Sequence, residues 1–272
     1  MLDEVKNIAK QAGTLILSIY NSAESASSKS KSDGSPLTRA DQSAHDYIFS
    51  ELSKKFVNIP IISEEGSLAD WEERQHWKQF FLVDPLDGTK EFLNRNGEFT
   101  VNIALIEQHR PILSVVHVPV SGTTYFAELG KGAWREVAVL EPVRLRIRSR
   151  TEGEALLVVG SRSHASTQLD RFLVNLPESV LITRGSSLKL CMIAEGSADL
   201  YPRHGPTSIW DIAAGDCVLS EAGGFVVDAS GTCLTYGDKP TLRNQPFLAG
   251  SVLDSLVLNS FCASLTEEST TI

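Results

Sequence analysis

The sequence predicts a protein of mixed α and β structure, with an α+β first half built on an antiparallel sheet and an α/β second half built on a mixed sheet. Two helical patterns open the chain, and five β-rich runs follow one another between residues 59 and 127. From residue 155 onward, strands alternate with helices. We therefore expect two subdomains, residues 1–150 and residues 151–272.

The first half begins with two predicted helices. Residues 2–20 carry apolar side chains at helical spacing, and a second amphipathic helix is expected at 39–55. Between them, residues 21–36 are rich in Ser, Lys and Gly, which predicts a loop. Turn residues separate the short β-rich runs that follow, so we expect an antiparallel sheet with strands at 59–62, 80–83, 99–106, 112–118 and 123–127.

The second half begins after a basic stretch in which apolar residues alternate with Arg144, Arg146, Arg148 and Arg150. This alternation predicts an amphipathic strand with an exposed basic face rather than a nucleic-acid site. Beyond it, the pattern predicts strands at 155–160, 179–182, 198–201 and 247–249, and helices at 164–173, 186–195, 209–221 and 251–264. The polar tail 266–272 is expected to fray.

The composition excludes several classes of protein. A chain of 272 residues that is 42% hydrophobic can bury a large core. Its net charge of −9 argues against a nucleic-acid polymer as the main partner, because such binding depends on clustered Lys and Arg. The sequence has no apolar run near the roughly 20 residues of a membrane span and no signal-peptide pattern, so we expect a cytoplasmic protein. Its oligomeric state, monomer or homodimer, stays open.

The most informative segment is 84–89, Asp-Pro-Leu-Asp-Gly-Thr, which follows the apolar run 80–83. Its two carboxylates flank a proline at the predicted end of a buried strand, where their oxygens can converge on hard divalent cations. A glycine and a hydroxyl follow at once, which suits backbone N–H groups that receive phosphate oxygens. The structural alternative is a strand that ends in an ordinary turn, with Asp84 as a helix cap.

The same order of residues occurs twice more. The segment 61–66, Ile-Ile-Ser-Glu-Glu-Gly, is a short apolar run that ends in carboxylates, and Asp211 opens the predicted helix 209–221. Hydrolysis of a phosphate ester needs metal ions that neutralise charge and activate water, and the carboxylates for such ions must come from several elements. The three clusters therefore predict a metal-dependent phosphatase.

The segments 63–66, 84–89 and 210–215, with the ending 221–224, resemble in order and separation the signature set of the inositol monophosphatase superfamily of magnesium-dependent, lithium-sensitive phosphatases. The resemblance runs from about residue 1 to about residue 265. It implies the layered αβαβα fold of sugar phosphatases, a small phosphate-ester substrate and about two to three Mg²⁺ ions. It also implies that loop 21–36 lies near the metals, and it leaves open a peripheral location at the inner membrane.

The resemblance implies a set of metal ligands. A first Mg²⁺ is held by Glu64, Asp84 and the carbonyl of Leu86, and a second by Asp84, Asp87 and Asp211. Glu64 also helps to place a third ion. The sequence leaves Glu65 either as a support for these ligands or as an exposed residue.

The resemblance also implies the reacting groups. Thr89 orients the water that attacks phosphorus, and Asp41 accepts the Thr89 hydroxyl proton. Without the resemblance, Asp41 is interpreted as a first-turn residue beside a Thr38 helix cap. Glu64 takes part in catalysis through the ions that it holds. Backbone N–H groups of Gly88 and Thr89 are expected on phosphate oxygens, because glycine permits a close approach.

The second half predicts which ester is bound. Segments 160–164 and 185–191 bring hydroxyls and cations to the starts of two helices, which suits a second phosphate or a ribose. With segments 90–92 and 199–203 they resemble the 3′(2′),5′-bisphosphate nucleotidase (CysQ-type) branch of the superfamily. The substrate residues implied are Gly88, Thr89, His164, Ser186, Lys189, Arg203 and Asp211.

This branch implies a reaction. The 3′-phosphate of adenosine 3′,5′-bisphosphate is hydrolysed to leave AMP and phosphate, the sulfated analogue is a further substrate, and the role lies in sulfur metabolism. Ile209 departs from the acidic residue that relatives of the branch usually show before Trp210. That departure concerns substrate choice and leaves the metal ligands intact.

Several alternatives stay open. Ser186 could serve as a helix cap, Lys189 could lie on a solvated helix face, and Arg203 and His164 could lie in surface loops. Inositol-1-monophosphatase and fructose-1,6-bisphosphatase activities occur in the same superfamily. A non-catalytic metal-binding regulator is a further alternative, although it would not need the complete set of Thr89, Asp41 and metal carboxylates.

Overall fold

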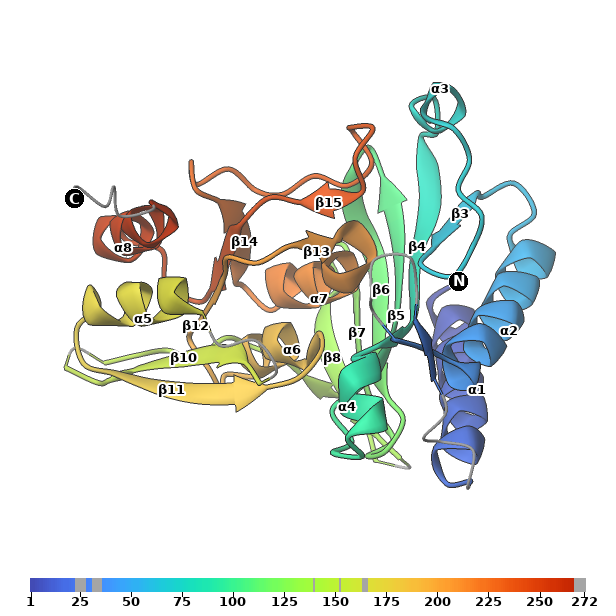
Figure 1. Ribbon diagram of the computed structural model, residues 1–272, viewed down its shortest axis with the longest axis horizontal. Helices are drawn as coiled ribbons and strands as arrows, with labels where there is room; N and C mark the ends of the chain where they lie inside the picture. Colours follow the sequence, from blue (N-terminus) through green and yellow to red (C-terminus); the bar gives the residue numbers. More distant parts are fainter. Residues whose placement is uncertain (23–27, 31–35, 139, 152, 163–165, 267–272) are drawn as a thin grey trace.

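The computed structural model describes residues 1–22, 28–30, 36–138, 140–151, 153–162 and 166–266. Within these residues the elements stack in five layers, helix, sheet, helix, sheet and helix (Figure 1). This is the αβαβα arrangement, so the predicted fold class is confirmed.

The first two layers are a helix pair and a seven-stranded sheet, counted over the described residues. Helices α1 (Leu2–Tyr20) and α2 (Arg39–Lys55) bury apolar faces against one side of the sheet. Their bounds match the predicted ones. The strands, in spatial order, are β3 (Ile61–Ser63), β4 (Gln79–Asp87), β5 (Thr100–Glu107), β6 (Arg110–Val118), β7 (Thr123–Glu128), β8 (Gly132–Val137) and β9 (Val143–Arg144).

The predicted antiparallel pairing is confirmed from β4 to β7, but it is wrong for β3 and β4, which run parallel. The antiparallel order continues through β8, which the sequence analysis missed, to β9. The connection between them is long enough for a crossover and contains helix α3 (Trp71–Arg74). Because the two strands run in the same direction, Ser63 stands beside Val83 and both strands end at the same edge of the sheet. That edge carries the acidic segments.

The predicted basic strand is wrong in length. Over the described residues near it, Val143–Arg144 alone pairs, as β9 against β8. The chain then leaves the sheet, because the Ile147 N–H bonds to Ala222 O at the end of another helix. Leu145 is buried and Arg146 is exposed. The alternation of apolar residues with arginines therefore reflects burial of single side chains rather than a strand.

The middle layer joins the two halves. Helix α7 (Ile209–Glu221) packs against β4, β5 and β6 on the face opposite to α1, and the shorter α6 (Leu188–Ala194) lies against α7. One core cluster contains Phe80 and Ile106 from the first half together with Ile212 and Leu219 from the second. An α7 that is apolar on most sides is expected for a helix buried between two sheets.

The fourth layer is a five-stranded sheet over the described residues, and its mixed character confirms the prediction. Its order is β11 (Ser179–Arg184), β10 (Leu156–Ser161), β12 (Leu200–Arg203), β16 (Phe247–Gly250) and β14 (Phe225–Asp228), the last of which the sequence analysis missed. Strand β10 is parallel to its neighbours, and β16 is antiparallel to its own. Helices α5 (Thr167–Val174) and α8 (Ser255–Leu265) cover the outer face, where Phe172 meets Phe261 edge to face.

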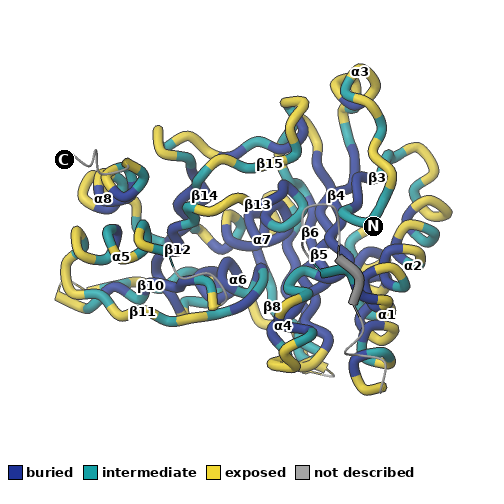
Figure 2. Tube along the Cα trace, viewed as in Figure 1, coloured by how far each residue is buried: buried dark blue, intermediate teal, exposed yellow. Residues whose placement is uncertain are grey.

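Buried residues follow the two sheets and α7, while the outer sides of the covering helices are exposed (Figure 2). The remaining elements are short: β1 (Ser28–Ser30), β2 (Pro36–Thr38), α4 (Thr89–Leu93), β13 (Thr207–Ser208) and β15 (Arg243–Asn244). Most of the predicted loop 21–36 and the tail 267–272 lie outside the described residues. Among the described helices, none combines the length and the apolar character that crossing a membrane requires.

Candidate active site

Glu64 stands directly after β3, at the edge where β3 and β4 both end. Its N–H donates to Val83 O at 3.1 Å, which continues the parallel pairing by one residue. The preceding Ser63 hydroxyl shares a hydrogen bond of 2.8 Å with His45 Nδ1 on α2. The backbone that presents Glu64 is therefore held from the sheet and from the helix.

Strand β4 carries Asp84 and Asp87 across an irregularity. Asp84 pairs with Asn102 and Asp87 with Thr100, so three steps along β4 match two steps along β5. In a regular strand, residues three apart point to opposite faces, and the extra residue of a bulge changes that phase. Both aspartates consequently line the same cavity, with Leu86 between them.

Asp211 comes from the start of α7. Ser208 and Asp211 form a capping box, in which the Ser208 N–H donates to Asp211 Oδ2 at 2.8 Å. The cap that begins the helix also sets the direction of the Asp211 side chain, and Asp211 lines the cavity opposite β4.

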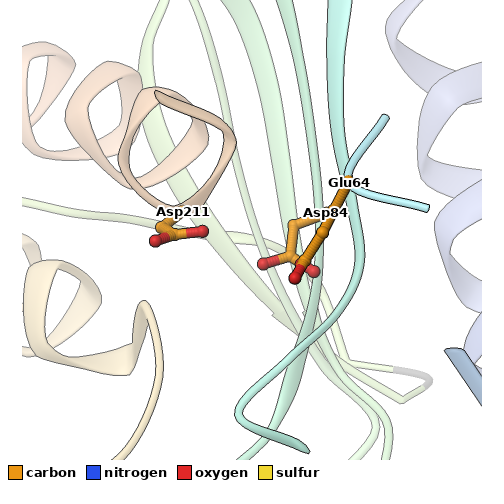
Figure 3. A group of neighbouring side chains, drawn as sticks. All are labelled: Glu64, Asp84 and Asp211. Carbon is orange, nitrogen blue, oxygen red and sulfur yellow. The ribbon is translucent and has the colours of Figure 1, made fainter. Parts of the chain in front are cut away.

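The three segments meet at one point. Figure 3 shows Glu64 and Asp84 side by side, with Asp211 extending toward them from α7. One carboxylate oxygen of each lies within 4.8 Å of those of the other two. They line a cavity of about 480 Å³ that also includes Asp87, Gly88 and Thr89.

Burial and like charges oppose ionisation of Asp84 and Asp211. Burial, and then the charge of Glu64, raises the pKa of Asp84 well above its ordinary range. Burial and the charge of Asp87 raise the pKa of Asp211 to about 8. Neighbouring carboxylates that repel one another can all be ionised when a divalent cation is bound between them, because the cation offsets the repulsion. Carboxylate oxygens are also the ligands that Mg²⁺ prefers. The donor set present fits such an ion.

Asp87 is tied to the second half of the chain. Its Oδ2 accepts the Ser187 N–H at 2.6 Å, from the turn that precedes α6. Burial raises the pKa of Asp87 to about 6, although nearby Lys189 and the Ser187 N–H act to lower it. Asp87 therefore lines the same cavity as Glu64, Asp84 and Asp211, but its carboxylate is held by the second half of the chain through Ser187.

Thr89 and Asp41, which the sequence pairs only by resemblance, are in contact. The Thr89 hydroxyl lies 3.1 Å from Asp41 Oδ1. Asp41 is also the helix-start residue that the alternative interpretation describes, because its Oδ2 accepts the Thr38 N–H at 2.7 Å. Asp41 therefore fits both interpretations: Oδ2 caps the helix, and Oδ1 contacts Thr89.

The predicted substrate residues divide into two groups. Ser186, Lys189 and Arg203 line the cavity, as do Gly88, Thr89 and Asp211. His164 lies outside the described residues. Glu65 is half-buried and is not among the described residues that line the cavity.

Lys189 and Arg203 differ in their surroundings. Lys189 is buried, with Nζ 2.6 Å from Ser186 O and 5.2 Å from the centre of the Tyr201 ring, so a place on a solvated helix face is wrong. Arg203 is half-buried, and its guanidinium donates to Gly205 O and Pro206 O at 3.1 and 3.0 Å. Both cations thus stand at the cavity with backbone carbonyls holding them.

The sequence analysis did not name Arg243, named Glu91 only within segment 90–92, and quoted Asp199, which proved structural. Arg243 lines the cavity from β15, which pairs with β13 so that Arg243 stands opposite Ser208. Glu91 lines it from α4. Asp199, quoted with the substrate segments, instead accepts hydrogen bonds from Arg148 and from the Leu157 N–H at 2.9 and 2.8 Å. No local signal marks Arg243, since only strand pairing brings it to the site.

Comparisons with known proteins identify the family of this chain. Residues 1–266 match the model of the inositol monophosphatase family. The chain is 48% identical over 247 residues to the 3′(2′),5′-bisphosphate nucleotidase CysQ of Escherichia coli O157:H7, covering 91% of this chain and 98% of that protein. It superimposes on the crystal structure of CysQ from Bacteroides thetaiotaomicron with a TM-score of 0.80 at 36% identity, covering 93% and 97% of the two chains.

A further match is the extragenic suppressor protein SuhB of Bartonella henselae, with a TM-score of 0.77 at 26% identity and 98% of each chain covered. The family model spans residues 1–266, which include the segments that carry Glu64, Asp84, Thr89 and Asp211. The chain belongs to the inositol monophosphatase family.

Proposed function

We propose that this chain is a 3′(2′),5′-bisphosphate nucleotidase that uses Mg²⁺ to remove the 3′-phosphate of adenosine 3′,5′-bisphosphate, leaving AMP and phosphate, and that also accepts the sulfated analogue. Similarity to the CysQ proteins over nine-tenths of the chain supports the choice of substrate. A role in sulfur metabolism follows from that substrate.

One observation carries the proposal: acidic and cationic side chains line a single cavity. Glu64, Asp84, Asp87 and Asp211 line this cavity, and so do Lys189, Arg203 and Arg243. A substrate that carries a single phosphate needs only the acidic residues that would hold the metal ions. Cationic side chains in the same cavity suit an ester that carries a second phosphate, because they can bind that phosphate.

The residues divide the work as follows. Bound Mg²⁺ ions, about two to three in number, would polarise the phosphate and lower the pKa of the attacking water. Glu64, Asp84, Leu86, Asp87 and Asp211, all of which line the cavity, would be the ligands, Leu86 through its carbonyl. The Thr89 hydroxyl orients the water while Asp41 Oδ1 accepts the hydroxyl proton.

The remaining residues hold the substrate. The N–H groups of Gly88 and Thr89 face the reacting phosphate, which the left-handed backbone of Gly88, with φ of 93°, leaves open to close approach. Ser186, Lys189, Arg203 and His164 bind the nucleoside and its retained 5′-phosphate. Asp211 also borders the sugar end of the ester.

A panel of substrates tests the proposal. Phosphate release is measured from adenosine 3′,5′-bisphosphate, its sulfated analogue, inositol 1-phosphate and fructose 1,6-bisphosphate, each with Mg²⁺ and with a chelator. We expect the highest kcat/KM on adenosine 3′,5′-bisphosphate, AMP as the product, and no turnover with the chelator. An equal or higher kcat/KM on inositol 1-phosphate or fructose 1,6-bisphosphate would overturn the choice of substrate.

Comparison with adenosine 3′-monophosphate isolates the second phosphate. Arg203→Ala removes a charged hydrogen-bond donor, so kcat/KM should fall by about 10- to 100-fold on the bisphosphate and far less on the monophosphate. Arg171→Ala, on α5 away from the cavity, serves as the matched control. Equal losses on both substrates in Arg203→Ala would remove Arg203 from the proposed binding site.

A further inference from the structure

The turn between β11 and α6 holds a serine in a conformation that serine rarely adopts. Ser186 has φ of 50°, in the left-handed region, and it lines the cavity. Such a backbone costs energy for a residue with a Cβ, so it persists only where the surroundings impose it. The contacts of the flanking residues show what imposes it here.

Hydrogen bonds from both neighbours of Ser186 cross to the first half of the chain. The Gly185 N–H donates to Glu98 Oε2 at 2.8 Å, and the Ser187 N–H donates to Asp87 Oδ2 at 2.6 Å. The Ser187 hydroxyl also donates to Asn102 Oδ1 at 2.9 Å. The turn is therefore fixed on each side of Ser186 by acceptors that lie 85 to 100 residues earlier.

Glu98 is itself held in place. Arg162 donates to both of its oxygens, at 2.8 and 2.7 Å, and Arg184 Nη1 donates to Oε1 at 3.0 Å. The Glu98 side chain is 10% exposed, although the two arginines are more open. A two-pronged arginine contact fixes the plane of a carboxylate, so the oxygen that faces Gly185 has a defined position.

The turn has no space in which to shift. A Cβ added to Gly185 would lie 2.6 Å from Glu91 Cγ and 3.0 Å from Glu98 O. A Cβ added to Gly88 would lie 3.3 Å from Ser186 Cβ. The turn thus packs directly on the acidic segment, and any movement of Gly185 changes the contacts of Ser186 and Ser187 as well.

We propose that Glu98 is a positioning residue for the site. By holding Gly185 it places Ser186 at the substrate and the Ser187 N–H on the Asp87 carboxylate. Among the described residues that line the cavity Glu98 is absent, so it acts through the turn rather than by touching the substrate. This role in substrate binding rests on the proposed nucleotidase function, whereas the role in holding Asp87 concerns the metal site alone.

The test compares two part-buried glutamates that each bond to an arginine. Glu98→Ala is matched by Glu195→Ala, since Glu195 is 17% exposed and accepts hydrogen bonds from Arg135 and Tyr125 at 2.9 and 3.0 Å. For each protein we measure the KM and kcat for adenosine 3′,5′-bisphosphate, the Mg²⁺ concentration at half-activation, and the rise in unfolding temperature that Mg²⁺ causes.

Glu98→Ala should raise the KM and the Mg²⁺ requirement by about 10- to 100-fold and reduce the Mg²⁺-dependent rise in unfolding temperature. Glu195→Ala should lower the unfolding temperature without changing the KM or the Mg²⁺ requirement. Unchanged KM and Mg²⁺ requirement in Glu98→Ala, or equal changes in both variants, would overturn the proposal.

Milder variants keep the test usable if Glu98→Ala does not fold. Glu98→Gln keeps an acceptor for Gly185 but loses the charge, and Arg162→Lys loses the two-pronged contact, so each should give a smaller change in the same direction. If the wild-type protein shows no nucleotidase activity, the proposed function fails. The Mg²⁺-dependent unfolding temperatures of the variants then still decide whether Glu98 positions the metal site.

Discussion

The Thr89 hydroxyl lies 3.1 Å from Asp41 Oδ1, although 48 residues separate them. Asp41 Oδ2 closes the cap of α2 at the same time, through the Thr38 N–H at 2.7 Å. Because the cap holds one oxygen, the other is presented to Thr89 in a fixed direction. The start of α2 therefore fixes the carboxylate oxygen that accepts the Thr89 hydrogen bond.

Replacing Thr89 by Val removes the hydroxyl and keeps the branched shape. We expect kcat to fall by about 10²- to 10⁴-fold, the range of a positioned proton-transfer group, with little change in the Mg²⁺ requirement. Thr89→Ser should keep part of the activity. Steady-state kinetics at saturating Mg²⁺ measure both variants.

Thr235→Val is the control for this comparison, because Thr235 makes a similar hydrogen bond of 2.8 Å to Asp238 in a different part of the molecule. Its kcat should match the wild type. If Thr89→Val retained full kcat, Thr89 would have no part in orienting the water.

Asp84→Asn should abolish activity and stabilise the metal-free protein. The neutral amide no longer faces the charges of Glu64 and Asp87, which act with burial to raise the pKa of Asp84. We expect kcat/KM to fall by at least about 10²-fold, since bound metal ions supply several kcal/mol of transition-state stabilisation. Thermal unfolding in a chelator should occur at a higher temperature than for the wild type.

Asp228→Asn should behave in the opposite way. Asp228 accepts hydrogen bonds from the Ser230 hydroxyl and from the N–H groups of Ser230 and Thr232, at 2.6, 2.8 and 3.0 Å. Burial acts to raise the pKa of Asp228, but these hydrogen bonds, that of the Ser230 hydroxyl first, leave it below the ordinary value. Its loss should lower the unfolding temperature and leave activity intact. A lower unfolding temperature for metal-free Asp84→Asn would contradict the repulsion described at the site.

The contribution of Asp87 and Asp211 to the stability of the metal-free protein should decrease as the pH rises from 4 to 9. Asp87 and Asp211 have pKa values of about 6 and about 8 in the folded protein, above the value of about 3.9 in an unfolded chain. Between these pH values the folded state binds more protons than the unfolded state. The stability that these protons contribute is fully present below about pH 3.9 and is lost as the pH rises through about 6 for Asp87 and about 8 for Asp211.

Bound Mg²⁺ should reverse this trend, because the cation favours the ionised carboxylates. The increase in unfolding temperature on adding Mg²⁺ should therefore be larger at pH 8 than at pH 6. Unfolding temperatures measured at a series of pH values, with Mg²⁺ and with a chelator, provide the check. An increase that shrinks toward high pH would show that these carboxylates do not bind the ion.

The backbone of Ser186 gives a stability prediction that does not depend on activity. Ser186→Gly and Ser186→Ala both lose the hydroxyl, but only alanine keeps a Cβ at φ of 50°. The glycine variant should therefore be more stable than the alanine variant by about 1 kcal/mol. At Ser18, inside α1, the order should reverse by about the same amount, since glycine is a poor helix former. Denaturant unfolding of the four variants measures both differences.

Much of the site could be predicted because its ligands follow local patterns. An apolar strand that ends in a carboxylate identified Glu64, Asp84 and Asp87, and a helix start identified Asp211. The fold class followed from the change from β-rich runs to alternating strands and helices. The division into subdomains at about residue 150 remains a prediction, since the core cluster shared by Phe80 and Leu219 spans that boundary.

What escaped prediction depends on pairing between distant segments. Glu98 and Gly185 meet across 87 residues, and Arg243 reaches the cavity through pairing with Ser208. Nothing near these residues in the sequence specifies their partners. The parallel pairing of β3 and β4 was missed for the same reason, because strand direction depends on how the connection between the strands crosses, not on the strands' own residues.

The packing of α7 against β4, β5 and β6 has a consequence for how the chain can be divided. A fragment that ended before α7 would expose a wide apolar face of its sheet to water, so it should aggregate. It would also lack Asp211 and therefore could not bind ions with the full ligand set. Two separately produced fragments should become catalytic only when they are refolded together.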